Sequence, residues 1–157
     1  EEYNNFEDED GCPDVGLLRH ETGGFILLEK IYFDTDSARI QERSYPVLDA
    51  ITAAMTGHTE VELVEIQGHA DERGDDEYNI QLTRDRAAAV REALIQRGVA
   101  GGRLRSAGYG ERCPTDPRHN ATAWEANRRV EVKILRTDTG PTGVEIACAA
   151  GQELIPR

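Results

Sequence analysis

A short charged stretch of the chain, GHADERGDDEYN at residues 68–79, holds side chains that could bind a ligand. Asp71 offers a carboxylate that accepts hydrogen bonds from an ammonium or amide group. Arg86 follows seven residues after Asn79, and its guanidinium can fork onto a carboxylate with two parallel hydrogen bonds, which a lysine cannot match. One carboxylate and one guanidinium together suit a zwitterionic, amino-acid-like ligand.

Other interpretations fit the same residues. An internal salt bridge between Asp71 and Arg86 would only order the loop, and composition alone favours it over a ligand site. His69 and Asp71 could instead act as a catalytic base and its orienting acid. However, no Ser or Cys stands in a nucleophile elbow near them, and the chain has neither an HExxH motif nor a Gly-rich phosphate cradle. A metal site on His69 lacks partners at ligand spacing, so the sequence predicts no catalysis, no metal and no cofactor.

The apolar pattern around this stretch predicts alternating strands and helices. Strands are expected at 25–33, 61–69, 103–110 and 128–136, helices at 44–57 and 79–97, and a helical turn at 122–126. Asp71 then lies just beyond the carboxyl end of a strand, where α/β folds gather their ligands. The loop DTDS follows the first strand, so Asp34, Thr35 and Asp36 reach the same rim if the two strands are near neighbours.

The order of these elements favours an α/β fold, built as an α+β sandwich in which a mixed sheet of about four strands packs against helices. Parallel strand pairs would be joined by right-handed helical crossovers, and the helices would cover one face of the sheet or both. We expect three regions: an acidic leader at 1–24, one domain at 25–136, and a loop-like tail at 137–157 that packs on the domain.

Charge and hydropathy exclude several classes of partner. The net charge of −12 repels nucleic acids and anionic membrane surfaces. No apolar run approaches membrane-spanning length, so any membrane association is expected through an anchor or targeting signal upstream of Glu1. The leader contains DEDG at 8–11, which offers oxygen ligands for calcium but lacks the loop spacing that ends in a bidentate Glu. A calcium-binding leader is therefore an alternative to a plain linker.

Four segments carry a family resemblance. They are IYFDTDSARI at 31–40, GHADERGDDEYNIQLTRDRAAAVREALIQRGV at 68–99, RLRSAGYGERCP at 103–114 and NRRVEVKIL at 127–135. In this order they closely resemble the OmpA-like C-terminal domain, over about residues 26–136. GHADERG followed by EYN is most similar to the family's branch of peptidoglycan-associated lipoproteins.

The resemblance implies a ligand and a set of contacts. The family binds peptidoglycan non-covalently in the bacterial periplasm, through the diaminopimelate residue of the stem peptide. The free end of that residue carries an ammonium and a carboxylate, so the resemblance favours a ligand site over the internal salt bridge. The family's key Asp falls on Asp71 and its key Arg on Arg86. Supporting contacts fall on Asp34, Thr35, Asn79 and Arg128, whereas Asp36 stands where relatives vary.

The resemblance also implies a role and a location. The chain would be a binding module without catalysis, anchoring an outer-membrane protein or lipoprotein to the cell wall at the periplasmic face of the outer membrane. His69 becomes a structural hydrogen-bonding residue. Two alternatives stay open: docking of other periplasmic envelope proteins, and a calcium-dependent spacer. The periplasmic setting favours a disulfide between Cys113 and Cys148 over unrelated thiols, with Cys12 left over.

Overall fold

A computed structural model of the chain describes residues 17–21 and 24–143. The strands are β1 (Leu18–Glu21), β2 (Gly24–Leu27), β3 (Val61–His69), β4 (Leu104–Gly108), β5 (Arg129–Thr137) and β6 (Gly140–Pro141). The helices are α1 (Tyr45–Gly57), α2 (Asp76–Gln96) and α3 (Ala121–Asn127), with 3-10 turns at Glu42–Ser44 and Gly101–Arg103. None of the helices in the described ranges has the length and apolar character needed to cross a membrane.

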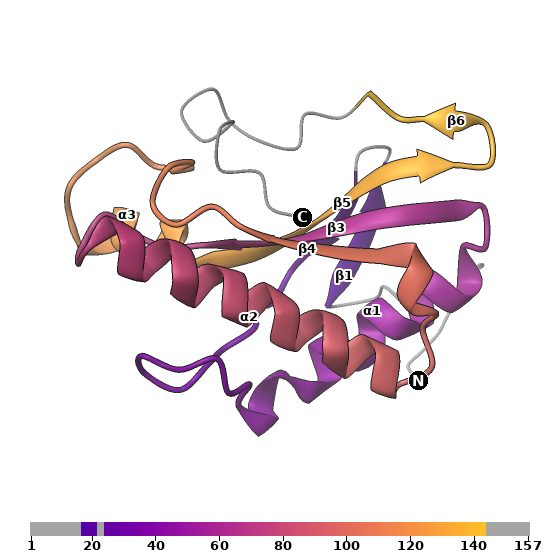
Figure 1. Cartoon of the computed structure of the whole chain (residues 1–157), viewed down its shortest axis with the longest axis horizontal. Helices are drawn as coiled ribbons and strands as arrows, with labels where there is room; N and C mark the ends of the chain where they lie inside the picture. The colour runs from indigo at the N-terminus through magenta and orange to yellow at the C-terminus, as the bar shows by residue number, and fades with distance from the viewer. Residues whose placement is uncertain (1–16, 22–23, 144–157) are drawn as a thin grey trace.

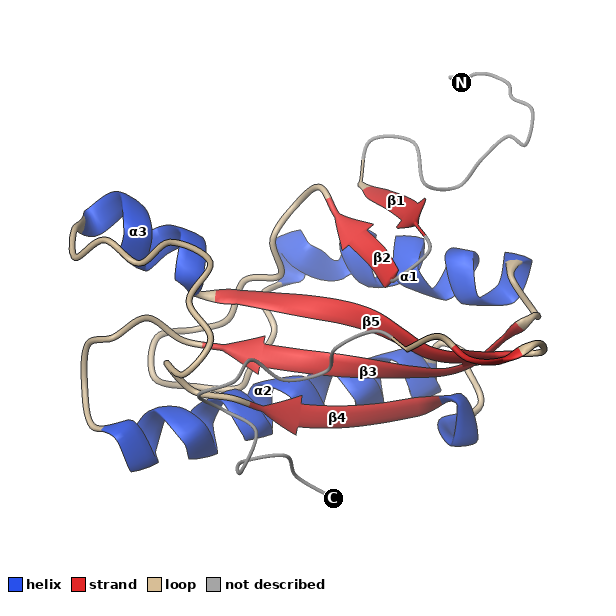
Figure 2. Cartoon of the chain, turned by 90° about the horizontal axis from the view of Figure 1, so that it is seen from above, coloured by secondary structure: helices blue, strands red, loops and turns tan. Residues whose placement is uncertain are grey.

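The strands form one mixed sheet in the order β1-β2-β5-β3-β4, with β6 paired to β5. β3 and β4 run parallel and α2 connects them, whereas the other pairings are antiparallel. Figure 1 shows α1 and α2 on one side of the sheet, and Figure 2 shows α3 beside the start of β5. The predicted mixed α/β fold is confirmed, with six strands in place of about four.

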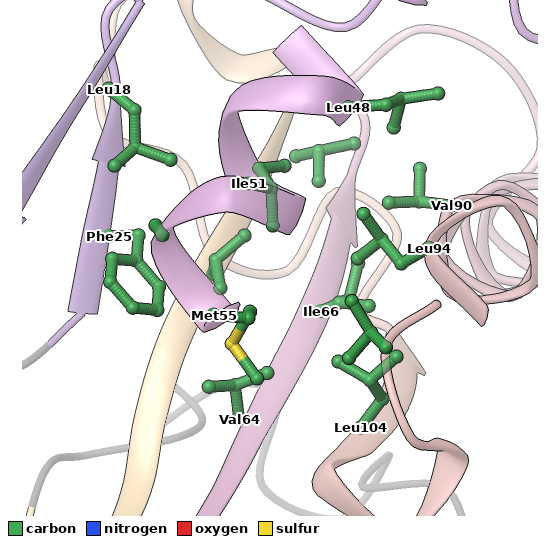
Figure 3. Packing of buried hydrophobic residues seen from close by; sticks show 14 of the residues in the cluster. Leu18, Phe25, Leu48, Ile51, Met55, Val64, Ile66, Val90, Leu94 and Leu104 are labelled. Atoms are coloured by element: carbon green, nitrogen blue, oxygen red, sulfur yellow. The ribbon is translucent and has the colours of Figure 1, made fainter. Parts of the chain in front are cut away.

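The hydrophobic core lies between the sheet and the two long helices (Figure 3). Leu18 and Phe25, from β1 and β2, close this core on the side of α1. Fully buried side chains of α1, α2 and β3 fill its centre: Ile51, Met55, Val90, Leu94, Val64 and Ile66. Burying each of these side chains stabilises the fold by about 1.5–3 kcal/mol, so the core fixes where α2 lies on the sheet.

The other face of β3 is polar and buried as well. Glu65 is fully buried, and its carboxylate accepts hydrogen bonds from the Tyr109 hydroxyl at 2.5 Å and from Gln67 Nε2 at 3.1 Å. Arg105 completes the set with an ion pair to Glu65 at 2.8 Å. These partners offset the cost of removing a carboxylate from water. The prediction that 61–69 is a strand covered on both sides is confirmed.

The predicted strand at 25–33 is wrong beyond Leu27, where β2 ends. An apolar, β-prone composition suggested a longer strand with a bend near Glu29 and Lys30, but among residues 28–33 only Phe33 makes a further bridge, to Ile40. Ile31 enters the core and Lys30 turns away to pair with Glu125, 3.0 Å distant. A strand that the sequence did not predict lies in the expected leader: β1 pairs with β2, and its Leu18 is fully buried.

Two helix starts differ from the prediction in their capping. α2 begins at Asp76 rather than at Asn79, because the carboxylate of Asp75 accepts a hydrogen bond from the amide of Tyr78 at 3.1 Å and caps the first turn. Ser44 precedes α1 as predicted, but its hydroxyl accepts from the amide of Tyr32 at 2.7 Å instead of capping the helix. The remaining predicted elements agree with β4, α3 and β5 to within a few residues.

Several predictions fall outside the described residues. Cys12, Cys148, the DEDG stretch and the tail beyond residue 143 all lie there. The disulfide between Cys113 and Cys148 and the calcium alternative therefore stay predictions.

Two glycines allow α2 to lie very close to the sheet. A Cβ on Gly68 of β3 would lie 2.4 Å from the carbonyl oxygen of Thr83, and a Cβ on Gly108 of β4 would lie 2.2 Å from the amide nitrogen of Arg84. Both atoms belong to the backbone of α2, which cannot move aside as a side chain could. The close approach fixes the middle of α2, and with it Arg86.

The substitution Gly108→Ala should lower the free energy of unfolding by about 1–3 kcal/mol, because the added methyl group must push the backbone of α2 off the sheet. Gly57→Ala is the control, since a Cβ there meets nothing within 4 Å, and it should leave stability unchanged or raise it. Urea unfolding followed by circular dichroism measures both. Equal midpoints for Gly108→Ala and the native chain would contradict the close approach.

Candidate functional site

A cavity of about 660 Å³ opens at the carboxyl end of β3. Its walls come from the loop after β2, the loop after β3, the first half of α2 and the junction of α3 with β5. The two loops meet at one rim, although β5 lies between β2 and β3 in the sheet. Five of the six residues expected to bind the ligand line this cavity: Thr35, Asp71, Asn79, Arg86 and Arg128.

Asp71 is buried, and two arginines hold its carboxylate. Arg73 donates to it from the backbone amide at 2.8 Å and from Nη2 at 2.7 Å, and Arg128 donates from Nη1 at 2.7 Å. Burial by itself raises the pKa of the Asp71 carboxyl group, but these hydrogen bonds outweigh it and the pKa lies below its ordinary value. Asp71 is therefore an anion that orients two cationic side chains at the cavity.

Arg86 reaches the cavity from inside α2 and is held by neutral groups. Its Nε donates to the carbonyl oxygen of Ser37 at 2.7 Å, its Nη2 donates to that of Asp34 at 3.1 Å, and its guanidinium carbon lies 4.8 Å from the centre of the Phe33 ring. Burial lowers the pKa of this half-buried guanidinium. Within the described ranges it forms no ion pair with a carboxylate, so its charge is available to an anionic ligand.

The alternative of an internal salt bridge is wrong for this structure. The ion-pair partners of Asp71 are Arg73 and Arg128, whereas Arg86 donates to carbonyl oxygens. The predicted pair of residues thus shares a cavity without neutralising each other.

Asp34 differs from the prediction in how it contributes. Its carboxylate does not line the cavity and pairs with Arg39 at 2.9 Å, whereas its carbonyl oxygen holds Arg86. Asp36, two residues further on, does line the cavity and accepts a hydrogen bond from the Tyr78 hydroxyl at 3.0 Å. Asp36 has a φ of 53°, a conformation that Asp tolerates better than most residues.

Asn79 fastens the charged loop to α2. Its Nδ2 donates to the carbonyl oxygen of Arg73 at 2.8 Å, and its side chain is buried. The position at the helix start suggested a ligand contact. The structure shows in addition that Asn79 fixes the loop that carries Asp71 and Arg73.

Arg73, which lines the cavity, and Trp124, which packs against Arg73, were not among the residues expected at the site. The guanidinium carbon of Arg73 lies 4.4 Å from the centre of the Trp124 ring, and Trp124 Nε1 donates to Glu72 at 2.8 Å. Arg73 could have been found, because an amide two residues after an Asp commonly closes an Asx turn onto that carboxylate. Trp124 carried no such signal, since it meets the loop only through the fold.

His69 does not have the properties of a catalytic base. Its Nε2 lies 3.1 Å from Gln67 Oε1, and its ring stacks on that of Tyr109 at 5.4 Å. Gln67 donates to Glu65 through Nε2, so its Oε1 must accept, and His69 carries its proton on Nε2. His69 Nδ1 has no hydrogen-bond partner within the described part of the chain. Burial and the nearby charge of Arg129 lower the pKa of His69 to about 3.

His69 should therefore stay neutral from pH 8 to about pH 5, whereas a free imidazole titrates near pH 6.5. Because only the unfolded chain takes up this proton, native stability should fall as the pH drops below about 6.5. In His69→Gln that fall should be smaller. Imidazole NMR signals and urea unfolding between pH 7 and pH 5 test both points. A midpoint near pH 6.5 for the His69 ring would contradict the buried, neutral assignment.

The chain is similar to known proteins over most of its length. The OmpA family matches residues 32–130. The peptidoglycan-associated lipoprotein of Rhizobium meliloti (strain 1021) is 40% identical over 101 residues, which are 64% of this chain and 57% of that protein. Outer membrane porin F of Pseudomonas aeruginosa is 34% identical over 128 residues, 81% of this chain and 35% of that protein. The crystal structure of the peptidoglycan-associated lipoprotein from Burkholderia pseudomallei is 33% identical, with a TM-score of 0.60, and covers 67% of this chain and 89% of that one.

The chain belongs to the OmpA family. The family resemblance inferred from the four segments is confirmed, including its likeness to the peptidoglycan-associated lipoproteins. Membership makes the chain a binding module rather than an enzyme. The chain spans 57% of the length of the Rhizobium relative.

Proposed function

We propose that the cavity binds the diaminopimelate end of a peptidoglycan stem peptide and so anchors this chain to the cell wall. The observation that carries the proposal is Arg86, a half-buried guanidinium in the cavity wall whose described partners are carbonyl oxygens. A buried cation gains most from an anion that fills its remaining donor positions. A carboxylate of diaminopimelate supplies that anion.

The charge of the cavity supports a carboxylate-bearing ligand. The chain as a whole has a net charge of −12, yet cations outnumber anions in the cavity wall. The cationic side chains there are Lys30, Arg43, Arg73, Arg86, Arg128 and Arg129, and the anionic ones are Asp36, Asp71 and Glu125. A local excess of positive charge in an acidic protein favours an anionic group at this place rather than over the whole surface.

The acidic residues and the remaining polar groups of the cavity would orient the ammonium group of diaminopimelate. Asp71 attracts the ammonium group and holds Arg73 and Arg128 in place. Thr35 and Asn79 complete the rim with a hydroxyl and an amide, and Asp34 acts through its carbonyl oxygen on Arg86. We expect modest affinity for one stem peptide, with many copies facing a polymeric wall providing avidity.

The relatives suggest the setting. Two of those described above are named peptidoglycan-associated lipoproteins, and a third is an outer membrane porin. We therefore infer that this domain works at the periplasmic face of the outer membrane, as part of an outer-membrane protein or lipoprotein.

Arg86→Lys and Asp71→Asn should each weaken binding to purified peptidoglycan sacculi about tenfold or more, because a hydrogen bond to a charged group contributes about 1.5–3 kcal/mol. Arg86→Lys keeps the positive charge but loses the fork that grips a carboxylate. Co-sedimentation with sacculi and calorimetric titration with free diaminopimelate measure the loss.

Arg97→Lys is the matched control. Arg97 stands at the far end of the same helix, pairs with Asp49 at 2.9 Å and does not line the cavity. This variant should bind sacculi as the native chain does. If both cavity variants are folded by circular dichroism and also bind like the native chain, the proposal is wrong.

A further inference from the structure

Three potential metal ligands meet at the opposite end of the sheet from the cavity. His20 lies in β1, His58 follows the last residue of α1, and Glu60 precedes β3. One donor atom from each of the three side chains lies within 4.8 Å of the other two. Residues 38 positions apart in the sequence thus come together only through the fold.

The distances are close to those of a bound ion. Two donors that share one Zn²⁺ lie at most about 4.2 Å apart, because each bond is about 2.1 Å long. The donor atoms of the three side chains lie within 4.8 Å of one another, slightly beyond that limit, and His58 Nδ1 lies 3.1 Å from Glu60 Oε2. Small side-chain rotations would bring the three donors around one ion.

The turn that carries two of these ligands is fixed by the backbone. The carbonyl oxygen of His58 accepts from the amide of Val61 at 3.0 Å and from Arg103 Nη2 at 3.1 Å. The carbonyl oxygen of Glu60 accepts from the amide of Asp138 at 2.9 Å. Binding an ion would therefore require little further ordering of the turn.

The third ligand, His20, packs against an apolar side chain. His20 pairs with Phe25 across the β1–β2 hairpin, and its ring lies 5.2 Å from that of Phe25. Phe25 is buried in the core, and its ring is 6.0 Å from that of His58. The side chains of His58 and Glu60 are 34% and 44% exposed to solvent, so an ion could reach them. An apolar base with an open polar side is common in metal sites.

We propose that His20, His58 and Glu60 form a binding site for a divalent transition-metal ion such as Zn²⁺, with water completing the coordination. Two imidazoles and one carboxylate match the donor preferences of zinc and its neighbours, whereas calcium and magnesium prefer oxygen ligands alone.

Such an ion would join an edge strand of the sheet to the start of an interior strand. His20 belongs to the edge strand β1, whereas His58 and Glu60 immediately precede the interior strand β3. Since β3 spans nine residues, or about 30 Å, the ion would lie far from the peptide cavity at His69. We therefore expect metal binding to stabilise the fold without changing ligand affinity.

Calorimetric titration of the whole chain with ZnCl₂ tests the proposal. The native chain should bind one ion at this site, and a zinc concentration about 100-fold above Kd should raise Tm by about 5–10 °C. His20→Ala, His58→Ala and Glu60→Gln should each weaken that binding about tenfold or more. Affinity for sacculi should stay the same with and without zinc.

Two controls separate this site from zinc bound elsewhere. His119→Ala removes an exposed histidine that pairs with Glu72, and Glu62→Gln removes an exposed acid two residues from Glu60. Both should titrate like the native chain. The proposal is overturned if the native chain binds no zinc, or if the three ligand variants bind zinc as tightly as the two controls do.

Discussion

The close contact between α2 and the parallel strands β3 and β4 positions most of what the domain uses. Gly68 and Gly108 present no side chain to the helix, so its backbone lies almost directly on the sheet. The carboxyl end of β3, which Asp71 follows, is thereby brought level with the first half of α2, which carries Asn79 and Arg86. A bulkier residue at either glycine would separate the two halves of the site before it disturbed any ligand contact.

Asp71 and Arg86 differ in how far the protein neutralises their charges, and this difference determines what the site can bind. Asp71 already has Arg73 and Arg128 as partners, whereas the guanidinium of Arg86 donates to carbonyl oxygens. Had the two residues paired with each other, the guanidinium of Arg86 would already have been neutralised by a carboxylate of the protein. The protein instead uses other arginines to neutralise its buried acid, which leaves Arg86 for the ligand.

Regular apolar patterns in the sequence correctly predicted the elements whose side chains are buried against neighbouring elements. Residues 61–69 form β3 within the predicted bounds, because alternating side chains there are buried on both faces. The strand predicted at residues 28–33 does not form. These residues have a strand-like composition, but no described strand lies beside them to pair with, and pairing is a long-range property. For the opposite reason, the sequence did not predict β1. It is only four residues long, three of them are charged or polar, and it is held in place by pairing with β2 and by the burial of Leu18.

The residues of the site, like the strands, could be predicted from the sequence only in part. The family resemblance indicated Asp71 and Arg86, but it could not show that Asp34 would turn its carboxylate toward Arg39 and offer only its carbonyl oxygen. Nor could spacing along the chain reveal that Trp124, 51 residues beyond Arg73, would lie against its guanidinium. Which atom of a residue faces a cavity depends on packing that no local pattern contains.

The strand order also decides how an anchor of this kind would carry mechanical load. β3 and β5 share eight paired positions, whereas β2 and β5 share two among the described residues. A pull on the chain before β1, resisted by a ligand held at the end of β3, passes through both ladders in series. The ladder with fewer paired positions yields first, so the β1–β2 hairpin can peel away while the ladder between β3 and β5 still holds.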